Sequence, residues 1–387
     1  MVEPMRILQF VPYFVPYLGG QEKYVYNLSK YLVKMGHEVH VITSNFPKSK
    51  NFEEIEGITV ERYKPIVRPL RNPIVLKFLR VPRRFKNFDI VHIHNEHAFS
   101  SMIAAFAKRK QNFPLVLTNH GKLIFGRYIE DRIERVYLKY IGKKIFELSD
   151  IIVVNSKSDK NFISSIVPKS TEKIYIFHNA IDIGFLSKRI NYVTGEEFEY
   201  DGSDFKILYV GALIKRKGIE WLIKAMKIVK EEMNKKVKCI LVGEGQDRNY
   251  FERLVRKYNL SKTVIFAGKI SDEKLIWLYK NSNIFVLPSL SEGCSTSILE
   301  AMYIGLPVIA TDIPGNRDHF KDVAILVPPK DENILADAIV KLLNDEELAK
   351  HLSIIGKNLV KSKYRWDVLA KKYNKLYEEL LNRVSCI

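Results

Sequence analysis

The 387-residue sequence predicts an α/β protein with two Rossmann-like, doubly wound domains. Its length suits two or three domains. Short apolar runs alternate with amphipathic helical patterns, which is typical of parallel strands joined by helical crossovers. A polar segment at 185–204 interrupts this alternation and indicates a linker. We therefore expect an N-terminal domain at 1–184 and a C-terminal domain at 205–364, facing each other across a cleft.

The opening of the chain favours a ligand-binding loop. An apolar run at 6–11 is followed by Gly19 and Gly20 and then by helical spacing of apolar residues at 21–35. A glycine pair at a helix entrance lets the backbone approach a ligand closely. The pattern G-x-G-x-x-G is absent, so a dehydrogenase-type nucleotide site is not predicted. Further strands are expected at 90–94, 115–118, 151–154 and 174–177.

Histidines follow two of these strands. His92, His94 and His97 form an H-x-H-x-x-H pattern, but we find no carboxylate or cysteine cluster that would complete a metal site, and we predict none. We expect His92 to be a core imidazole, and His94 and His97 to be candidates for contact with an acceptor or donor hydroxyl. His120 ends the next strand before a glycine and should project into the cleft; the alternative is an ordinary loop histidine.

Basic residues mark the start of the C-terminal domain. After an apolar run at 206–210, Arg216 and Lys217 precede a glycine and the helical pattern 219–232. A guanidinium fork and an ammonium at a helix entrance suit a diphosphate. The alternative is a solvated turn.

Two carboxylates bracket a predicted helix start further along the chain. Glu292 follows a short strand at 284–287, and Glu300 lies within a helical pattern at 296–303. The backbone N–H groups of Gly293, Cys294 and Ser295 would point out of this helix end, which attracts anions and above all phosphate. On spacing alone, a capping Glu and a solvated helix Glu are the favoured interpretation of the pair.

The whole stretch VLPSLSEGCSTSILEAMYIGLPVIATDIPGNRD, with Glu-x7-Glu followed by Gly305-x-Pro307, resembles the signature of retaining glycosyltransferases of family 4, which have the GT-B fold. The resemblance implies that Glu292 faces a donor sugar and that Glu300 holds a ribose. It also implies that His120 contacts the donor sugar near its reacting end.

The resemblance extends over nearly the whole chain and assigns further roles. It places the glycine loop at 19–20 against the donor diphosphate and the base near Ile270. It also predicts that the C-terminal helix, 365–387, packs back on the N-terminal domain. The family pattern V-G-R-L-x-x-x-K-G is broken by Ala212, where an arginine usually stands. Lys217 keeps its place in the pattern, and we hypothesise that Arg216 replaces the missing guanidinium.

These expectations define a retaining, metal-independent hexosyltransferase that uses a UDP- or GDP-sugar and a glycan or lipid-linked acceptor. No D-x-D motif occurs, so we expect neither a metal nor any other cofactor. The alternatives are another GT-B enzyme, either a sugar-nucleotide epimerase or a phosphorylase, and a non-catalytic basic binding protein. The long Glu292–Glu300 block argues against the two enzymes.

The formal net charge of +18 points to an anionic partner. Residues 62–86 hold nine Lys or Arg and no acid, interleaved with apolar residues, which suits an anionic membrane surface. A solvated face is the alternative; nucleic acid is not favoured, because no recognition signature accompanies the charge. We see no membrane span, signal peptide or paired cysteines, and we expect a cytoplasmic protein, peripheral on the inner face of the cell membrane.

Overall fold

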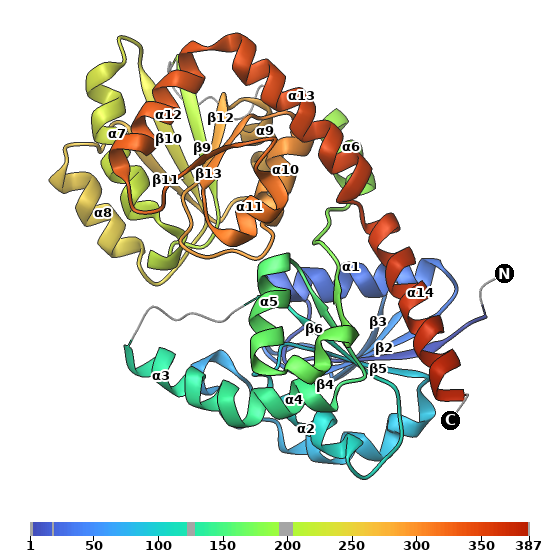
Figure 1. Cartoon of the computed structure of the whole chain (residues 1–387). Coiled ribbons are helices and arrows are strands. Elements are labelled where there is room, and N and C mark those ends of the chain that lie inside the picture. Colours follow the sequence, from blue (N-terminus) through green and yellow to red (C-terminus); the bar gives the residue numbers. More distant parts are fainter. Residues whose placement is uncertain (1–2, 18, 122–127, 193–203, 386–387) are drawn as a thin grey trace. The chain divides into compact units, whose positions relative to one another are not determined.

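The computed structural model of the chain describes residues 3–17, 19–121, 128–192 and 204–385 (Figure 1). These residues form two compact units. The first unit contains the described residues up to 179 together with those from Trp366 onward, and the second unit contains those at 180–365. Each unit has a largely parallel sheet with helices on both faces, which confirms the predicted fold class of two Rossmann-like domains.

The sheet of the first unit has eight strands in the order β3-β4-β2-β1-β5-β6-β7-β8, and only the edge strand β3 is antiparallel to its neighbour. Its strands are β1 (Arg6–Phe10), β2 (Glu38–Ser44), β3 (Phe52–Ile55), β4 (Ile58–Tyr63), β5 (Ile90–His94), β6 (Leu115–Asn119), β7 (Ile151–Val154) and β8 (Ile174–Ile176). The order of the strands reverses between β1 and β5. This position is the topological switch point of the sheet.

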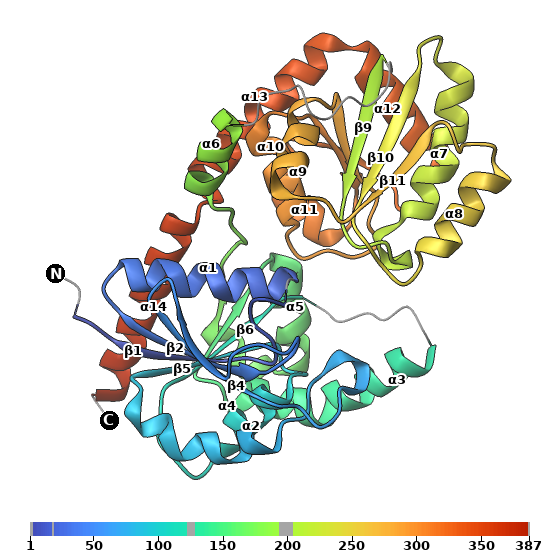
Figure 2. The ribbon, with the colours of Figure 1, turned by 180° about the vertical axis from the view of Figure 1, so that it is seen from behind.

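Helices cover both faces of this sheet. They are α1 (Gly20–Lys34), η1 (Pro69–Arg71), η2 (Leu76–Asn87), α2 (Phe99–Lys108), α3 (Tyr128–Tyr137), η3 (Leu138–Gly142), α4 (Lys143–Leu148), α5 (Lys157–Ile166), η4 (Pro168–Lys173) and α14 (Trp366–Ser385). The last helix, α14, lies beside α1 on one face, and α2 and α4 lie on the opposite face (Figures 1 and 2). The C-terminal segment therefore belongs to the first unit, as the resemblance implies.

The two faces of the first sheet differ in polarity. Leu8 and Phe10 point into an apolar cluster shared with η2, α2 and α4. Because side chains alternate along a strand, Gln9 points to the other face, toward α1 and α14. His92 and His94 on β5 share that face, and all three polar side chains are fully buried. This sheet therefore carries an apolar core on one side and a polar layer on the other.

The second unit has six parallel strands in the order β11-β10-β9-β12-β13-β14, with its switch point between β9 and β12. The strands are β9 (Phe205–Val210), β10 (Val237–Val242), β11 (Val264–Gly268), β12 (Ile284–Leu287), β13 (Val308–Thr311) and β14 (Ile325–Val327). The helices are α6 (Ile183–Tyr192), η5 (Lys215–Lys217), α7 (Ile219–Glu232), α8 (Arg248–Lys257), α9 (Asp272–Lys280), α10 (Thr296–Ile304), α11 (Pro314–Phe320), α12 (Glu332–Asn344) and α13 (Glu346–Lys363).

The segment at 185–204 differs from the expected linker. Helix α6 occupies its first part, and the residues at 193–203 lie outside the described chain. The composition of the segment suggested a loop because it is polar overall. However, Leu186 on α6 is buried in the core of the second unit, and this contact gives the helix a packed face.

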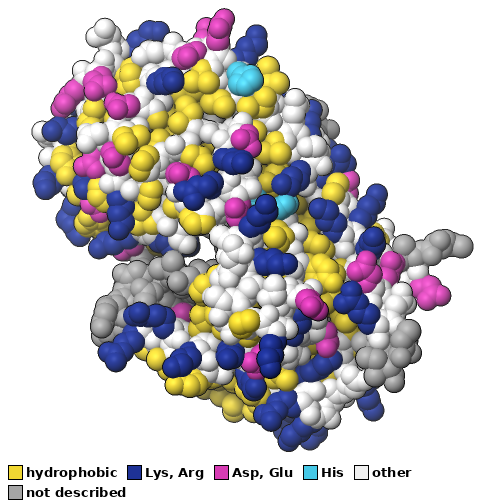
Figure 3. All heavy atoms as spheres, in the orientation of Figure 1, with side chains coloured by type: hydrophobic (Ala, Val, Ile, Leu, Met, Phe, Trp, Pro, Cys, Tyr) yellow, Lys and Arg dark blue, Asp and Glu magenta, His cyan; other side chains and the backbone are white. Residues whose placement is uncertain are grey.

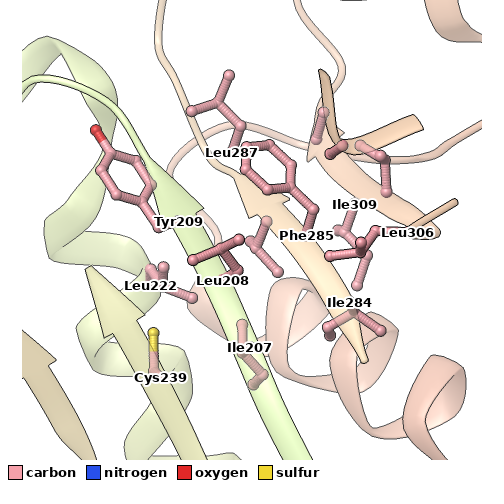
Figure 4. Packing of buried hydrophobic residues seen from close by; sticks show 14 of the residues in the cluster. Ile207, Leu208, Tyr209, Leu222, Cys239, Ile284, Phe285, Leu287, Leu306 and Ile309 are labelled. Carbon is pink, nitrogen blue, oxygen red and sulfur yellow. The ribbon is translucent and has the colours of Figure 1, made fainter. Parts of the chain in front are cut away.

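The core of the second unit is apolar on both faces of the sheet. Figure 4 shows side chains of β9, among them Ile207 and Leu208, packed beside those of β12, among them Ile284 and Phe285. Consecutive residues on these strands are buried, which is the pattern of strands covered by helices on both sides. Both faces of this sheet are therefore covered mainly by apolar side chains, unlike those of the first sheet.

Candidate active site

Most of the predicted site residues lie on loops beside the two switch points. In doubly wound sheets, ligands bind at the carboxyl ends of the strands near such points, because the crossovers diverge there and leave a crevice. In the first unit the loops after β1 and β5 flank the switch point; they carry Gly19 and His97, and Gly20 is the first residue of α1. In the second unit the loops after β9 and β12 carry Arg216, Lys217, Glu292, Gly293, Cys294 and Ser295.

A buried ion pair joins the two switch-point loops of the second unit. The ammonium of Lys217 lies 2.5 Å from Oε1 of Glu292, and the hydroxyl of Ser289 donates to the same oxygen at 2.6 Å. The two charged side chains are only 16% and 10% exposed. Burial by itself would raise the pKa of Glu292, but the positive charges of Lys217 and Arg216 outweigh it and lower that pKa. Glu292 is therefore an ionised carboxylate held in one place.

Backbone contacts lock these loops together. Gly218 has a left-handed φ of +68°, and a Cβ at this position would lie 1.8 Å from the carbonyl oxygen of Pro288. The N–H of Leu290 donates to the carbonyl of Arg216 at 2.8 Å, and the Arg216 guanidinium donates to the carbonyl of Ser291 at 2.8 Å. Glycine at 218 thus allows the close approach that places Lys217 against Glu292. Arg216 uses one of its five N–H donors to hold the loop.

Helix α10 begins at Thr296, as predicted, with Ser295 as its N-cap residue. The Ser295 hydroxyl contacts the hydroxyl of Ser297 at 3.0 Å and does not cap the backbone N–H groups of the helix. Glu300 accepts a hydrogen bond of 3.1 Å from the hydroxyl of Tyr279, a fully buried neighbour on α9. The partly buried Ile270 lies just before α9 and packs against the core of the second unit.

His120 follows β6 in the first unit and is held on three sides. Its Nε2 lies 3.0 Å from Nδ1 of His94, and its backbone N–H donates to Oδ1 of Asn95 at 2.9 Å. The ring of Tyr24 meets it edge-on, with 4.8 Å between centroids. Burial, and to a smaller degree the neighbouring His97, lowers the pKa of His120 to about 3. The imidazole is therefore neutral at physiological pH.

The histidines of β5 are both fully buried. His92 is a core imidazole as predicted, and its ring nitrogens contact the hydroxyls of Tyr377 and Thr118 at 2.7 and 2.8 Å. His94 was an acceptor-side candidate, and its geometry opposes that role. Both of its ring nitrogens are already engaged, one by Gln9 at 2.9 Å and the other by His120. His94 therefore has no ring nitrogen left for a substrate.

Asn95 is a site residue that the sequence reasoning missed. It has a left-handed φ of 59°, and its buried amide donates to Oε1 of Gln21 at 2.7 Å while accepting from the backbone of His120. It thus ties together the chain after β1, β5 and β6. The available signal was an asparagine directly after a strand, because asparagine tolerates the left-handed region better than most residues.

The glycine pair after β1 adjoins a second missed residue, Glu22. A Cβ at Gly19 would lie 2.3 Å from a carboxylate oxygen of Glu22, whereas Gly20 has no neighbour within 4 Å of that position. Burial raises the pKa of Glu22 to about 7. A side chain at position 19 would therefore require the Glu22 carboxyl group to move, whereas Gly20 leaves open space at the helix entrance.

Two carboxylates lie beside His97, contrary to the expectation that none accompanies the histidine pattern. Ligand atoms of Glu96, His97 and Glu134 lie within 4.8 Å of one another, close enough for the three to share a cation. Glu96 also accepts a hydrogen bond of 2.5 Å from Asn119. Burial raises the pKa of Glu96 to about 7.

Part of the basic segment 62–86 is exposed on the surface of the first unit. Ile66, Leu76 and Leu79 are 62%, 56% and 60% exposed. Within the described residues, Arg62 pairs with Glu53 and Arg84 pairs with Glu61, while Arg68 and Lys77 lie over the rings of Phe46 and Tyr63. On the face shown in Figure 3, Lys and Arg side chains are spread over both units. Within the described residues, no helix is both long and apolar enough to cross a membrane.

Comparison with known proteins defines the class to which this fold and site belong. The structure resembles sucrose-phosphate synthase from Thermosynechococcus elongatus with a TM-score of 0.78 and 24% identity, over 98% of this chain and 100% of that one. It resembles Anabaena HepE in complex with UDP and glucose with a TM-score of 0.75 and 17% identity, over 97% and 100%. Both likenesses support the GT-B fold of glycosyltransferases.

Sequence comparison identifies the family. The family models described as Glycosyltransferase Family 4 and Glycosyl transferases group 1 match residues 18–185 and 196–359. An uncharacterised glycosyltransferase of Methanocaldococcus jannaschii is 29% identical over 98% of this chain and 99% of its own length. The chain is a glycosyltransferase and belongs to family 4, among the group 1 glycosyl transferases.

Proposed function

We propose that this protein moves a hexose-type sugar from a UDP- or GDP-sugar to a glycan or lipid-linked acceptor, with retention of anomeric configuration and without a metal. The observation that carries the proposal is the buried Lys217–Glu292 pair at the switch point of the second unit. A sugar diphosphate presents both hydroxyls and negative charge, and this pair offers an acceptor for the former and a cation for the latter.

The leaving diphosphate is stabilised by protein cations and by a helix end. An ammonium has three donors, so Lys217 can hold Glu292 and a phosphate oxygen together, and Arg216 has N–H donors beyond the one on Ser291. The N-terminus of α10 at Gly293, Cys294 and Ser295 adds the positive end of its dipole. These groups supply the electrostatic stabilisation that a metal ion supplies elsewhere, so we expect no cofactor.

The two glutamates take different parts of the donor. Glu292 is ionised and fixed by Lys217 and Ser289, so it accepts hydrogen bonds from the donor sugar and is not a free nucleophile. Glu300 lies within α10, four residues after its first residue, Thr296, and accepts from the ribose hydroxyls, with Ile270 near the base. The UDP and glucose in the structure of HepE support this donor class.

The first unit supplies uncharged contacts. His120 contacts the donor sugar near its reacting carbon, Gly19 and Gly20 approach the diphosphate, and His97 remains the acceptor-side candidate. The exposed apolar and basic residues of 62–86 favour an acceptor at an anionic membrane surface. We therefore place the protein in the cytoplasm, peripheral on the inner face of the cell membrane.

A thermal-shift screen of UDP- and GDP-sugars in metal-free buffer tests the proposal. A ligand that binds only the folded state raises the unfolding midpoint by mass action. We expect one nucleotide class to stabilise the wild type and to lose most of that effect in Glu300→Gln. Tyr279→Phe is the matched control, because it removes the hydroxyl that donates to Glu300 and leaves the carboxylate itself in place. No stabilisation by any nucleotide sugar at millimolar concentration would contradict the proposal.

A further inference from the structure

A chain of hydrogen bonds runs through the polar layer of the first unit and ends at His120. The side-chain carbonyl of Gln9 lies 2.9 Å from Nε2 of His94, and Nδ1 of His94 lies 3.0 Å from Nε2 of His120. The amino end of the same Gln9 amide lies 3.4 Å from Nδ1 of His92. Gln9, His92 and His94 are fully buried. Strands β1 and β5 thus place one amide between two imidazoles.

The other branch of the chain leads to helix α14. Tyr377 contacts Nδ1 of His92 at 2.7 Å, and Nε2 of His92 contacts the hydroxyl of Thr118 at 2.8 Å. Thr118 contacts Tyr373 at 2.8 Å, and Tyr373 contacts Tyr24 at 2.8 Å. Every ring nitrogen of His92 and His94 therefore has a partner, which is what a buried imidazole requires.

The Gln9 amide determines which ring nitrogen of each neighbouring histidine carries the proton, because its carbonyl only accepts hydrogen bonds and its amino group only donates them. His94 must therefore donate from Nε2, and as a neutral ring it presents a lone pair at Nδ1. That lone pair accepts from His120, so His120 carries its proton on Nε2. On the other side, His92 accepts at Nδ1 and donates from Nε2 to Thr118, in agreement with donation from Tyr377.

We propose that Gln9 is a positioning residue that acts through His94 to fix His120 as the Nε2–H tautomer. The Nδ1 of His120 is then a lone pair, and no described residue donates to it. Such a nitrogen binds a hydroxyl or an amide N–H and repels a phosphate or carboxylate oxygen. The inference rests on the proposed function: it assigns a sugar hydroxyl to His120 and leaves the diphosphate to Lys217 and Arg216.

Electrostatics supports the neutral state that this chain requires. A protonated imidazole donates from both nitrogens, and one such ring would break the sequence of donors and acceptors. Burial lowers the pKa of His92 and of His120 to about 3, and it lowers that of His94 well below its usual value. All three rings therefore stay uncharged at the pH of the cytoplasm.

The tautomer can be read directly in the wild type without any donor. In protein labelled with 15N-histidine, two-bond nitrogen–proton correlations distinguish Nε2–H, Nδ1–H and protonated rings. The variant His120→Asn identifies the signals of that ring among the nine histidines of the chain. We expect His120 to be neutral with its proton on Nε2. A proton on Nδ1, or a charged ring at neutral pH, would overturn the proposal.

Two matched variants test the role of Gln9. Gln9→Met has a similar length but lacks both amide groups, so we expect His120 to become a mixture of tautomers. Tyr373→Phe removes a hydroxyl from the same layer and leaves both ends of Gln9 engaged, so His120 should keep Nε2–H. An unchanged tautomer in folded Gln9→Met would refute the positioning role. The wild-type spectrum tests the tautomer assignment by itself, even if this variant does not fold.

Substrate measurements separate this inference from the proposed function. We expect Gln9→Met to lower kcat/KM for the nucleotide sugar about tenfold, the effect of one misdirected hydrogen bond to an uncharged group. Its affinity for the free nucleoside diphosphate, which lacks the transferred hexose and its hydroxyls, should be unchanged. An equal loss for both ligands would contradict a hydroxyl at His120. If no nucleotide sugar binds, the proposed function fails while the tautomer result stands.

Discussion

The two units bury their polar groups in opposite ways. The first unit places uncharged side chains under α1 and α14, where Gln9, His92 and His94 form a layer with tyrosine and threonine hydroxyls. The second unit keeps both faces of its sheet apolar and places an ion pair, Lys217 with Glu292, at the ends of its strands. The first unit thus presents a neutral hydrogen-bond acceptor, and the second unit presents a fixed ion pair.

This difference indicates which part of the proposed substrate each unit can bind. A charged diphosphate needs cations, and the second unit holds them beside an ionised carboxylate. A neutral sugar needs directed hydrogen bonds without net charge, and the first unit provides a neutral imidazole of fixed direction. Variants in either unit test this division of roles, and the largest effect is expected at the ion pair.

Breaking the ion pair should have the largest effect. Glu292→Gln leaves the Lys217 ammonium without its carboxylate, and Lys217→Met removes the ammonium but leaves the Ser289 hydroxyl and the Arg216 charge near Glu292. Each variant should lower the free energy of unfolding by about 3 kcal/mol. Each should also lower sugar transfer by at least about 100-fold. Urea unfolding and donor turnover measure the two effects. The double variant should regain much of the stability and none of the activity. Strictly additive losses would show that the two charges do not interact.

The next effect concerns the glycine that brings the loops of the second unit together. Gly218→Ala forces a Cβ into the carbonyl of Pro288, so we expect a loss of about 3 kcal/mol or more and weaker donor binding. Gly36→Ala is the matched control, since Gly36 also has a left-handed φ but no neighbour within 4 Å. The control should lose only about 1 kcal/mol. Equal losses in both variants would mean that conformational strain alone accounts for Gly218.

Acid should weaken the first unit through its buried histidines. The folded-state pKa of His92 is about 3, below its ordinary value of 6.5, so its contribution is present above pH 6.5 and is lost as the pH falls toward 3. At pH 5 the loss from this residue is about 2 kcal/mol. Glu22 and Glu96 act in the opposite sense, because a pKa raised to about 7 gives stability that is present below pH 4.5 and lost as the pH rises through 7.

Urea unfolding as a function of pH checks this prediction. Below pH 6.5 the histidines whose pKa is lowered outnumber the two glutamates whose pKa is raised. Acidification should therefore destabilise the wild type. His92→Gln should reduce the slope by about one proton. A slope that is the same in the variant would show that His92 is not buried in its neutral form. Glu292, whose pKa is lowered, should stay paired with Lys217 throughout this range.

The smallest effect on stability is expected at the exposed surface of 62–86. Leu76→Ser with Leu79→Ser, or Arg80→Ala with Arg83→Ala, should change the free energy of unfolding by less than about 0.5 kcal/mol and reduce sedimentation with anionic vesicles. Ile354→Ser, at a 51% exposed position of the second unit, is the control. Unchanged sedimentation in both patch variants would contradict the proposed membrane contact.

The sequence predicts the second unit's site better than the first unit's. Lys217 and Glu292 each lie in a recognisable motif that follows a short apolar strand, and the ends of parallel strands meet at one edge of a sheet. No sequence motif contains Gln9, and the role of a single polar residue in a strand can be inferred only from the residues that it contacts in the folded structure. Those neighbours lie far away in the sequence: the chain of hydrogen bonds that starts at Gln9 ends at Tyr373 and Tyr377 on α14.

Long-range packing also explains the expectations that needed correction. His94 looked accessible from its position near the end of a strand, but the fold covers it with α1 and α14 and engages both ring nitrogens. Glu134 lies far from the neighbouring residues Glu96 and His97 in the sequence, so its approach to them could not be foreseen. Helix α6 lies in a segment that is polar overall, and it is stabilised because Leu186 is buried in the core of the second unit.

The most direct test of the central claim is proton NMR of the nucleotide sugar during turnover, in buffer containing EDTA, first without and then with an acceptor glycan. We predict release of the nucleoside diphosphate without metal. The newly formed sugar should first appear in the anomeric configuration that it had in the donor. The opposite anomer appearing first, or an epimerised nucleotide sugar with no diphosphate released, would contradict the account.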